Sequence, residues 1–240
     1  MNKISFSIGN KIIGDGKNCL IQTMGDRKTS DYEYAIRQTN ELSHKGLDMM
    51  RFSILDEEDI KGLKIIKENV SIPIIADIHF DYRFALMALS AKADKIRINP
   101  GNIGGEDKLR LVIQECKKNN VPIRIGVNSG SLNKYRGRTS SKAKDILLAL
   151  DETISIFKEE NFDHIVLSLK SSDPDDLKEI YELAYQKYPY PLHLGLTESG
   201  FSTLGVMKSS IALYPLLKEG IGDTLRISLA DDRVEEIRAC

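Results

Sequence analysis

Basic and polar side chains recur two residues apart inside short apolar segments of this sequence. In KIRIN, Arg97 and Asn99 alternate with two isoleucines, and IRIGVN carries Arg124 and Asn128 in a similar way. Because successive side chains of a β-strand point to opposite faces, the polar members of each segment should share one face. Other segments repeat the pattern with these residues: Arg51 and Ser53, Asp77 and His79, Ser168 and Lys170, Arg226 and Ser228, and Glu198 at the end of LGLTE.

The charges in these segments favour anion binding. Four arginines and one lysine accompany only two carboxylates, Asp77 and Glu198, which leaves an excess of about three positive charges. Crowded cations that lose their hydration need a counter-charge, and guanidinium groups match phosphate oxygens in a bidentate way. Gly101, Gly104 and Gly105 precede a predicted helix, where backbone N–H groups can meet a phosphate. A diphosphate fits this set better than a single phosphate.

The elements that must position these residues alternate between strand and helix patterns. The predicted strands span residues 19–24, 47–54, 72–80, 95–99, 122–128, 164–170, 192–198 and 224–230. The predicted helices begin near Ser30 and then span residues 57–69, 81–90, 106–119, 145–160, 174–188 and 202–218, with an eighth beginning in DDRVEEIRAC. Ser30, Asp81 and Asp173 are the expected helix N-caps.

Eight such units predict a single-domain (β/α)8 TIM barrel over residues 1–240, with the segment ISFSIGNKIIG as a β-hairpin closing the barrel bottom. An open, doubly wound sheet is the alternative. The polar residues lie in the carboxyl halves of their strands, the end at which barrel enzymes build their active sites.

Composition excludes several other classes of protein. The net charge of −1 gives no overall attraction for nucleic acid or an anionic membrane. The three cysteines, Cys19, Cys116 and Cys240, form no C-x-x-C pair, so the sequence predicts neither a disulfide framework nor a metal site. Without a signal peptide or a long apolar run, we expect a soluble cytoplasmic protein.

Several residues have a structural alternative to a functional role. His79 fits an acid/base group and a structural histidine equally well, whereas His193 is expected to be a hydrogen-bonded core residue. Lys170 could bind phosphate, pair with a carboxylate or form a Schiff base, and binding is the preferred interpretation. Loops 25–31 and 133–142 have no assigned role. The run KYRGR (134–138) within the second is expected to be solvated, or alternatively to act as a lid.

Six segments resemble a known family. ADIHFDYR, KIRINPGNIG, IRIGVNSGSL, HIVLSLKSSD, PLHLGLTESG and GIGDTLRISL, in this order, are similar to the barrel domain of 4-hydroxy-3-methylbut-2-enyl diphosphate synthases. The resemblance implies an iron–sulfur oxidoreductase of non-mevalonate isoprenoid biosynthesis. Its reaction would be the reductive ring opening of 2-C-methyl-D-erythritol 2,4-cyclodiphosphate to 4-hydroxy-3-methylbut-2-enyl diphosphate, with flavodoxin or ferredoxin as electron donor and a homodimer as the working form.

The resemblance also implies roles for particular residues. Asp77, His79 and Glu198 match active-site positions, and Glu198 is the expected carboxylate near the substrate hydroxyls. The matched substrate-binding positions are Arg51, Arg97, Asn99, Arg124, Asn128, Lys170, Arg226 and Ser228.

The family's [4Fe–4S] cluster domain, with three Cys and one Glu ligand, has no counterpart before Cys240. We therefore expect no cluster on this chain, and no turnover without the iron–sulfur domain of the complete enzyme. The principal hypothesis is the substrate-binding barrel of this synthase. The alternatives are a non-catalytic diphosphate-binding barrel and a Schiff-base lyase that uses Lys170.

Overall fold

The computed structural model describes residues 3–127, 137, 139–197, 199–230 and 232–240. Eight parallel strands form one sheet in the order β8-β7-β6-β5-β4-β3-β10-β9. A further parallel bridge joins Leu167 of β8 to Leu192, just before β9, so the two ends of the sheet meet. The predicted (β/α)8 barrel is confirmed, and the open doubly wound sheet is wrong.

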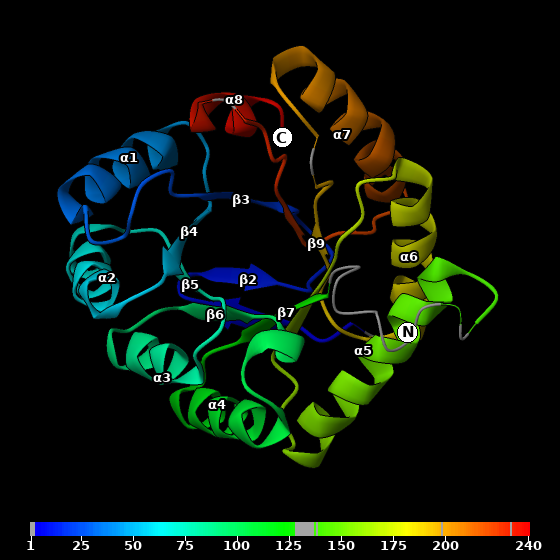
Figure 1. The fold of residues 1–240 in the computed structure, drawn as a ribbon. Helices are drawn as coiled ribbons and strands as arrows, with labels where there is room; N and C mark the ends of the chain where they lie inside the picture. Colours follow the sequence, from blue (N-terminus) through cyan, green and yellow to red (C-terminus); the bar gives the residue numbers. More distant parts are fainter. Residues whose placement is uncertain (1–2, 128–136, 138, 198, 231) are drawn as a thin grey trace.

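A ring of helices surrounds the strands, as Figure 1 shows. The barrel strands are β3 (Leu20–Met24), β4 (Met49–Ile54), β5 (Ile74–Ile78), β6 (Lys95–Ile98), β7 (Ile123–Val127), β8 (Ile165–Leu169), β9 (His193–Leu194) and β10 (Thr224–Leu225). The helices are α1 (Tyr32–His44), α2 (Glu57–Asn69), α3 (Tyr82–Ser90), α4 (Glu106–Asn119), α5 (Lys142–Glu159), α6 (Pro174–Lys187), α7 (Ser202–Lys218) and α8 (Arg233–Arg238), with a 3-10 turn η1 (Pro100–Asn102) before α4.

The last two strands are shorter than predicted. The ladder continues only as far as the Arg226 N–H, which donates to the Leu194 carbonyl (3.0 Å). Beyond that point the Leu229 N–H donates to the Glu236 carboxylate, and the Ala230 N–H donates to the Gly200 carbonyl. Because these groups bond to a side chain and a loop, the expected strands 192–198 and 224–230 end early.

Most helix starts follow from capping. Asp81 accepts from the Arg83 N–H, and Asp173 accepts from the first two N–H groups of its helix, as predicted. The prediction for Ser30 is wrong, because α1 begins after Asp31, and the Ser30 N–H instead donates to Asp59 (2.9 Å). Helix α5 begins three residues before the expected position 145, because the Ser141 hydroxyl caps it.

The two faces of the barrel wall differ in chemistry. Buried isoleucines such as Ile96, Ile98 and Ile125 face the helices and join one large apolar core. Their neighbours along the same strands, Arg97 and Arg124, face the interior and are also buried. Pairing aligns Arg97 with Asp77 on one side and with Arg124 on the other, so the charged side chains share one level of the barrel.

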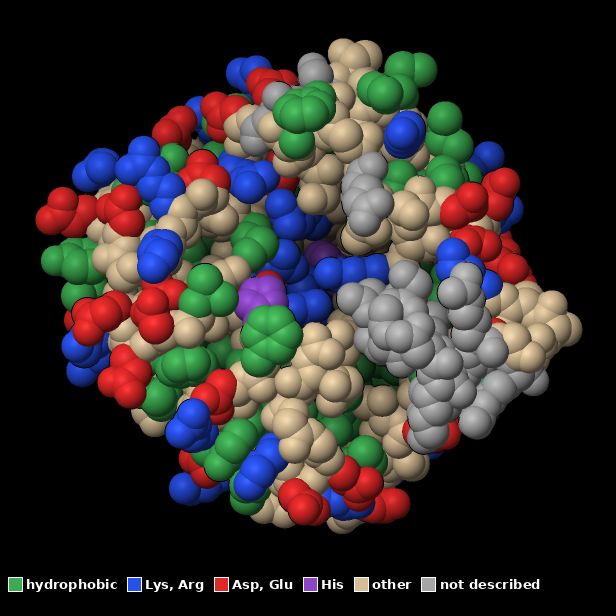
Figure 2. Space-filling view, in the orientation of Figure 1, with side chains coloured by type: hydrophobic (Ala, Val, Ile, Leu, Met, Phe, Trp, Pro, Cys, Tyr) green, Lys and Arg blue, Asp and Glu red, His purple; other side chains and the backbone are tan. Residues whose placement is uncertain are grey.

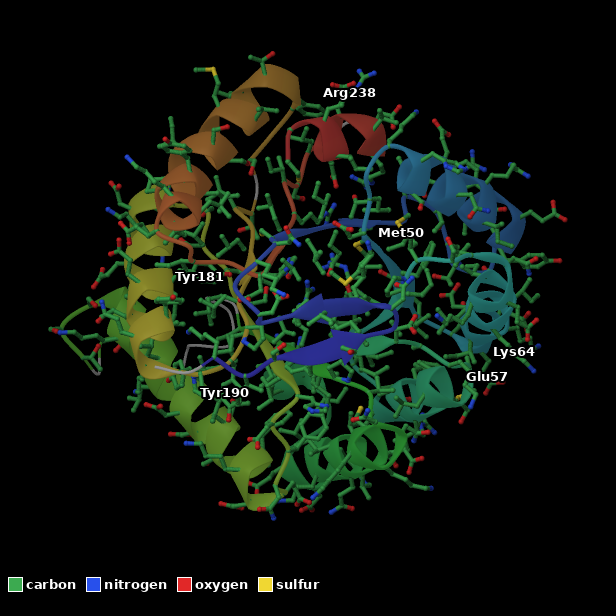
Figure 3. All side chains as sticks on the ribbon, turned by 180° about the vertical axis from the view of Figure 1, so that it is seen from behind. Met50, Glu57, Lys64, Tyr181, Tyr190 and Arg238 are labelled. Atoms are coloured by element: carbon green, nitrogen blue, oxygen red, sulfur yellow. The ribbon has the colours of Figure 1, made fainter. Side chains whose placement is uncertain are left out.

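A hairpin closes the bottom of the barrel, as predicted. Strands β1 (Phe6–Ile8) and β2 (Lys11–Ile13) pair in antiparallel fashion, and Figure 3 shows them lying across the barrel from behind. Residues from the hairpin and from the lower ends of four barrel strands form a second apolar cluster. Its buried members are Phe6, Ile8, Ile13, Leu20, Met49, Ile75 and Val166. None of the described helices is both long and apolar enough to cross a bilayer.

The hairpin floor gives a test of the packing. Ile8 is fully buried against the barrel, whereas Ile12 on the same hairpin is 57% exposed. We expect Ile8→Ala to lower the free energy of unfolding by about 2–4 kcal/mol, because it opens a cavity in the floor. The matched variant Ile12→Ala should change it by less than about 0.5 kcal/mol. Urea unfolding of both variants measures the difference, and equal effects would show that the hairpin is not packed on the barrel.

Candidate functional site

Cations from separate strands meet in a cavity at the carboxyl end of the barrel. Its volume is about 120 Å³, and its lining residues are Arg51, Arg124, Ser168, Lys170, His193, Gly195, Leu196, Thr197, Arg226 and Ser228. Figure 2 shows this hollow at the centre of the molecule, with blue Lys and Arg side chains around it. Of the eleven site residues predicted from sequence, Arg51, Arg124, Lys170, Arg226 and Ser228 line this one cavity.

Arg124 has no neutralising partner among the described residues. Its side chain is fully buried, and none of its three guanidinium nitrogens has a hydrogen-bond partner there. Burial, together with repulsion from Arg51 and Arg97, lowers the pKa of Arg124 well below its usual value. A buried cation without hydrogen bonds costs several kcal/mol unless a ligand supplies them. Arg124 is therefore a buried cation whose charge and hydrogen-bonding capacity are unsatisfied within the described part of the chain.

Asp77 is the counter-charge for two other arginines. Its Oδ1 lies 2.8 Å from Arg97 Nη1, and its Oδ2 lies 3.3 Å from Arg51 Nε. Although burial opposes its ionisation, the guanidinium groups of Arg51, Arg97 and Arg124 lower the pKa of Asp77 to about 2. Asp77 is therefore an ionised structural anchor of the cluster, and its one carboxylate pairs with two guanidinium groups.

A glycine makes room for Arg97. A Cβ atom added at Gly126 would lie 3.1 Å from Arg97 Nη2 and 3.2 Å from its Nε. Gly126 lies two residues beyond Arg124 on β7, so a side chain at this position would point into the barrel. The absence of a side chain there lets the Arg97 guanidinium lie against the strand while it reaches Asp77.

The pair Arg226 and Glu236 was not predicted. Arg226 Nη2 lies 3.1 Å from Glu236 Oε1, and Glu236, from α8, also accepts hydrogen bonds from Arg233, Thr23 and the Leu229 N–H. Burial by itself would raise the pKa of Glu236. The positive charge and hydrogen bond of Arg226 outweigh this effect, so the pKa of Glu236 is lowered overall. The short segment DDRVEEIRAC does not predict that its second glutamate points inward, because the orientation of α8 depends on its packing against β3 and α1.

Lys170 adds a further cation at the same cavity. Burial, with repulsion from Arg97, Arg124 and Arg51, lowers the pKa of Lys170 to about 8. His193 lines the same cavity, and its Nδ1 is 2.7 Å from the Thr224 hydroxyl, so it is a buried, hydrogen-bonded residue, as predicted. Burial and the surrounding cations lower the pKa of His193 well below its usual value, so this ring stays neutral.

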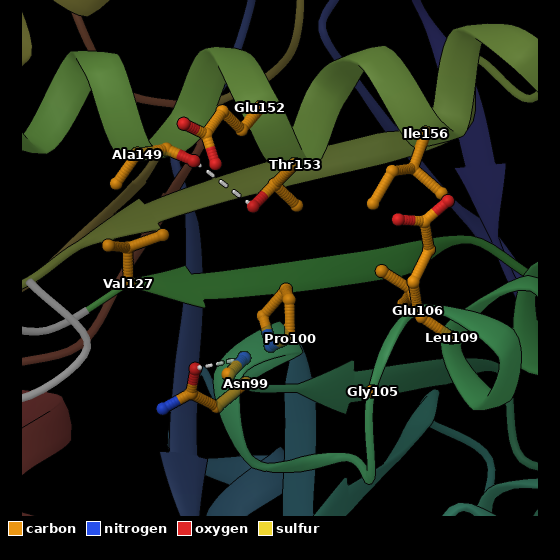
Figure 4. Close-up of a pocket in the computed structure, with 11 residues that line it drawn as sticks. Asn99, Pro100, Gly105, Glu106, Leu109, Val127, Ala149, Glu152, Thr153 and Ile156 are labelled. Carbon is orange, nitrogen blue, oxygen red and sulfur yellow. Dashed lines mark hydrogen bonds between the residues drawn. The ribbon is translucent and has the colours of Figure 1, made fainter. Parts of the chain in front are cut away.

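His79 and Asn99 lie outside the cavity lining. His79 Nε2 is 3.9 Å from Asp77 Oδ2 and 3.4 Å from the Ser53 hydroxyl, at the edge of the cation cluster. Asn99 accepts the Gly101 N–H (3.2 Å) and lines a separate cleft of about 360 Å³ between the η1–α4 segment and α5, shown in Figure 4. Gly101 and Gly105 line this cleft too, so the predicted phosphate contact of these glycines would lie there.

Two predicted residues, Asn128 and Glu198, lie outside the described residues, as do residues 134–136 and 138 of KYRGR. Their roles stay predictions.

Lys95 is a buried cation that the sequence analysis missed. It is fully enclosed, its Nζ has no partner among the described residues, and burial with repulsion from Arg124 and Arg51 lowers its pKa well below the usual value. The signal was present, since Lys95 stands two residues before Arg97 and therefore faces the same side of the strand. It was overlooked because it lies at the start of its strand.

The described residues contain no group of three or more His, Cys, Asp or Glu side chains that could ligate a metal. Cys116 is buried within α4, and burial raises the pKa of its thiol above its usual range. An iron–sulfur cluster needs several thiolate ligands at one place, so the described part of the chain does not fit that cofactor.

Fold and site together define a (β/α)8 barrel with basic side chains concentrated at its carboxyl-end mouth. The chain belongs to the GcpE TIM-barrel domain family, whose model matches residues 3–240.

Curated relatives support this assignment. A 4-hydroxy-3-methylbut-2-en-1-yl diphosphate synthase (flavodoxin) of Clostridium perfringens is 45% identical over 233 residues, covering 96% of this chain and 67% of the relative. Proteins of the same name from Caldanaerobacter subterraneus and Thermotoga petrophila are 44% and 42% identical, over 96% and 97% of this chain and 66% and 67% of their own length. The chain thus spans about two thirds of the length of these relatives.

Solved structures share the fold at low identity. Dihydropteroate synthase from Stenotrophomonas maltophilia superposes with a TM-score of 0.72 at 12% identity, covering 98% of this chain and 95% of that one. A truncated 3-deoxy-D-arabino-heptulosonate 7-phosphate synthase from Thermotoga maritima gives 0.63 at 12% identity, covering 98% and 86%. These likenesses show the barrel fold alone.

The anchoring role of Asp77 predicts a specific acid sensitivity. Its pKa near 2 in the folded protein lies below the ~3.9 of an unfolded aspartate. A lowered pKa stabilises the fold fully above about pH 4, and that stabilisation is lost as the pH falls from about 4 to about 2. Across this window we expect the free energy of unfolding of the native sequence to fall by on the order of 2 kcal/mol more than that of Asp77→Asn.

Urea unfolding from pH 5 downward measures the slopes. At neutral pH, Asp77→Asn should itself cost about 3–5 kcal/mol, because it leaves two buried guanidinium groups unpaired. The exposed residue Asp163, which precedes β8 at the opposite end of the barrel, provides the control, and Asp163→Asn should keep the native acid slope. An unchanged acid slope in Asp77→Asn would contradict the anchoring role.

Proposed function

We propose that this chain is the substrate-binding barrel of a 4-hydroxy-3-methylbut-2-en-1-yl diphosphate synthase, and that its mouth cavity binds the diphosphate group of 2-C-methyl-D-erythritol 2,4-cyclodiphosphate. The observation that supports this most directly is Arg124, whose three buried nitrogens have no partner among the described residues. Family membership supports the same ligand class, since the relatives are named as diphosphate synthases.

The balance of charge supports a ligand with more than one negative charge. Arg51, Arg124, Lys170 and Arg226 line the cavity, and Arg97 lies against its wall at Asp77. Asp77 and Glu236 are their ion-pair partners among the described residues, and Glu236 is shared with Arg233. A cyclic diphosphate carries one ionised oxygen on each phosphorus, so its two charges would offset most of the remaining excess.

The proposed roles of the residues follow from their positions. Arg124 and Lys170 would bind the phosphoryl oxygens, Arg51 and Arg226 would do so while held by Asp77 and Glu236, and Ser168 and Ser228 would add neutral hydrogen bonds. His79, which lies at the edge of the cluster, would contact the sugar-derived hydroxyls. Glu198, Asn128 and Asn99 stay candidate substrate contacts, with Glu198 as the proton relay for the departing hydroxyl.

The electrons for a reductive ring opening would come from outside the described residues. The relatives are named for flavodoxin, so we propose flavodoxin as the donor, with ferredoxin as the alternative. The family resemblance implies a [4Fe–4S] centre in the complete enzyme. Because the described residues offer no ligand set for it, the roles proposed for this chain are confined to binding and orienting the substrate.

Replacement of Arg124 should separate stability from binding. Arg124→Met removes a buried, unpaired cation but keeps much of its volume, so we expect the free energy of unfolding to rise by about 1–3 kcal/mol. Affinity for the cyclodiphosphate should fall by at least about 30-fold, because a buried hydrogen-bonded charge is worth 2–5 kcal/mol of binding energy. Calorimetric titration and urea unfolding measure the two effects.

A second arginine gives the matched control. Arg110 lies outside the barrel, in an ion-pair network with Glu106, Glu159 and Glu160. Arg110→Met should leave cyclodiphosphate affinity unchanged without raising stability. If Arg124→Met binds the ligand as tightly as the native sequence, the cavity is not the diphosphate site.

Lys170 should make binding depend on pH. With a pKa of about 8 in the free protein, its ammonium group is present at pH 7 and largely lost at pH 9. The anion favours the protonated form, so affinity should fall by up to about tenfold per pH unit above pH 8, with proton uptake on binding near that pH. Titrations in two buffers of different ionisation enthalpy measure the uptake, since the cyclic diphosphate does not itself titrate in this range.

The variant Lys170→Met isolates the effect. It should bind more weakly at pH 7 and show a flat pH dependence from pH 7 to pH 9. A native pH profile in Lys170→Met would mean that another group titrates in the cavity.

The lowered pKa of Lys170 also favours one alternative, a Schiff-base lyase, because the neutral amine is the nucleophile. Borohydride reduction in the presence of small phosphorylated aldehydes tests this directly. Covalent labelling of Lys170, detected by mass spectrometry, would support the lyase. An unmodified Lys170, together with cyclodiphosphate binding, would exclude the lyase and support the substrate-binding barrel of the synthase.

A further inference from the structure

The barrel closes along a seam between β8 and the segment that contains β9. At the lower end of this seam, Leu167 pairs with Leu192, and the Leu167 N–H donates to the Pro191 carbonyl (2.9 Å). At its upper end, the Thr197 N–H donates to the Ser171 carbonyl (3.2 Å). Both contacts belong to one parallel register, in which each residue on the β8 side faces the residue 25 positions further along the chain.

Between these two contacts, a tyrosine hydroxyl takes the place of a direct backbone hydrogen bond. In this register the Leu169 N–H would donate to the His193 carbonyl. Instead, the Leu169 N–H donates to the Tyr181 hydroxyl (3.0 Å), and that hydroxyl donates to the His193 carbonyl. Tyr181 thus bridges the two sides of the seam and holds them apart by the width of its oxygen atom.

Tyr181 belongs to α6, and its side chain reaches through the barrel wall. It is fully buried, and Figure 3 shows it on the side of α6 that faces the strands. A phenol can accept one hydrogen bond while it donates another, as this position requires. Burial raises the pKa of Tyr181 above its usual range, so the hydroxyl keeps the proton that it donates to His193. The Ser168 side chain, which lines the mouth cavity, also interacts with this hydroxyl.

The mouth cavity lies along the inner side of this seam. The lining residues that flank the seam are Ser168, Lys170, His193, Gly195, Leu196 and Thr197. Ser168 and Lys170 stand on either side of Leu169, whose N–H is bound by Tyr181. Since neighbouring side chains of a strand alternate between its faces, a shift of the backbone at Leu169 moves both of these cavity residues.

We propose that Tyr181 is a positioning residue of the mouth, whose hydroxyl sets the separation of the two cavity walls along the β8–β9 seam and thereby places Lys170. Binding groups work only when supporting contacts hold them within about 0.5 Å of the productive geometry. The effect of Tyr181 on the ligand rests on the proposed function, whereas its effect on the seam does not.

NMR of the native chain tests the bridge without any variant. The Leu169 amide should exchange with solvent at least about 100-fold more slowly than an unprotected amide, because its hydrogen bond is buried. No scalar coupling should pass from the Leu169 nitrogen to the His193 carbonyl carbon, because the hydroxyl lies between them. An unprotected Leu169 amide, or a coupling that shows a direct bond to His193, would overturn the proposal.

The variant Tyr181→Phe removes the hydroxyl alone. It leaves the Leu169 N–H and the His193 carbonyl without their partner, so exchange of the Leu169 amide should accelerate by at least about tenfold. A loosened seam admits water beside Lys170. Because burial is the largest cause of the lowered pKa of Lys170, this pKa should rise from about 8 toward the usual value of a lysine. NMR titration of the lysine side chains in the ligand-free chain measures the change.

Tyr188 provides the matched control. It directly follows α6, and its hydroxyl donates to the Leu147 carbonyl (3.2 Å) and to Asp151 (2.8 Å), both on α5 and away from the seam. Tyr188→Phe therefore removes a comparable hydroxyl and should leave the exchange of Leu169 and the pKa of Lys170 unchanged. The charges that act on Lys170 are the same in both variants, and they are those of Arg97, Arg124, Arg51 and Asp77.

Calorimetric titration separates this inference from the proposed function. We expect Tyr181→Phe to bind the cyclodiphosphate at least about tenfold more weakly than the native chain, and Tyr188→Phe to bind it normally. If the native chain does not bind the cyclodiphosphate but the pKa of Lys170 still rises in Tyr181→Phe, the proposed function fails and the positioning role stands. If Lys170 keeps its native pKa in Tyr181→Phe, the positioning role is overturned whatever the affinity.

Discussion

The structure depends on an excess of positive charge held inside a barrel. Arg51, Lys95, Arg97 and Arg124 are buried in the interior, and Asp77 is the one carboxylate among the described residues that pairs with any of them. Such an arrangement costs folding free energy through desolvation and mutual repulsion. The protein tolerates it because a closed barrel is stabilised from outside, by a continuous apolar layer between strands and helices.

The rest of the interior is arranged around these charges. Below them, the hairpin residues Phe6, Ile8 and Ile13 form an apolar floor together with the lower ends of barrel strands. Within the wall, Gly126 gives Arg97 the space to reach Asp77. At the other side, α8 brings Glu236 to Arg226, so a carboxylate from the end of the described chain holds an arginine that directly follows the last strand, β10. A bound polyanion would complete a set of charges that the protein itself leaves unbalanced.

The mouth of the barrel lacks negative charge, and a small anionic ligand would supply it. The buried cations there have a free-energy cost of desolvation, which such a ligand would remove.

The sequence by itself determined the barrel and much of its mouth. Alternation of two residues predicted that Arg97 of KIRIN and Arg124 of IRIGVN face inward, because a strand has only two faces, and the strand ends of a parallel barrel converge. Only the tertiary structure decided how the charges are shared. Lys95 proved to be enclosed, Asn99 turned to a neighbouring cleft, and Glu236 reached Arg226 from a helix of six residues. These outcomes depend on distances across the barrel between residues far apart in the chain, and periodicity along a single strand contains no information about such distances.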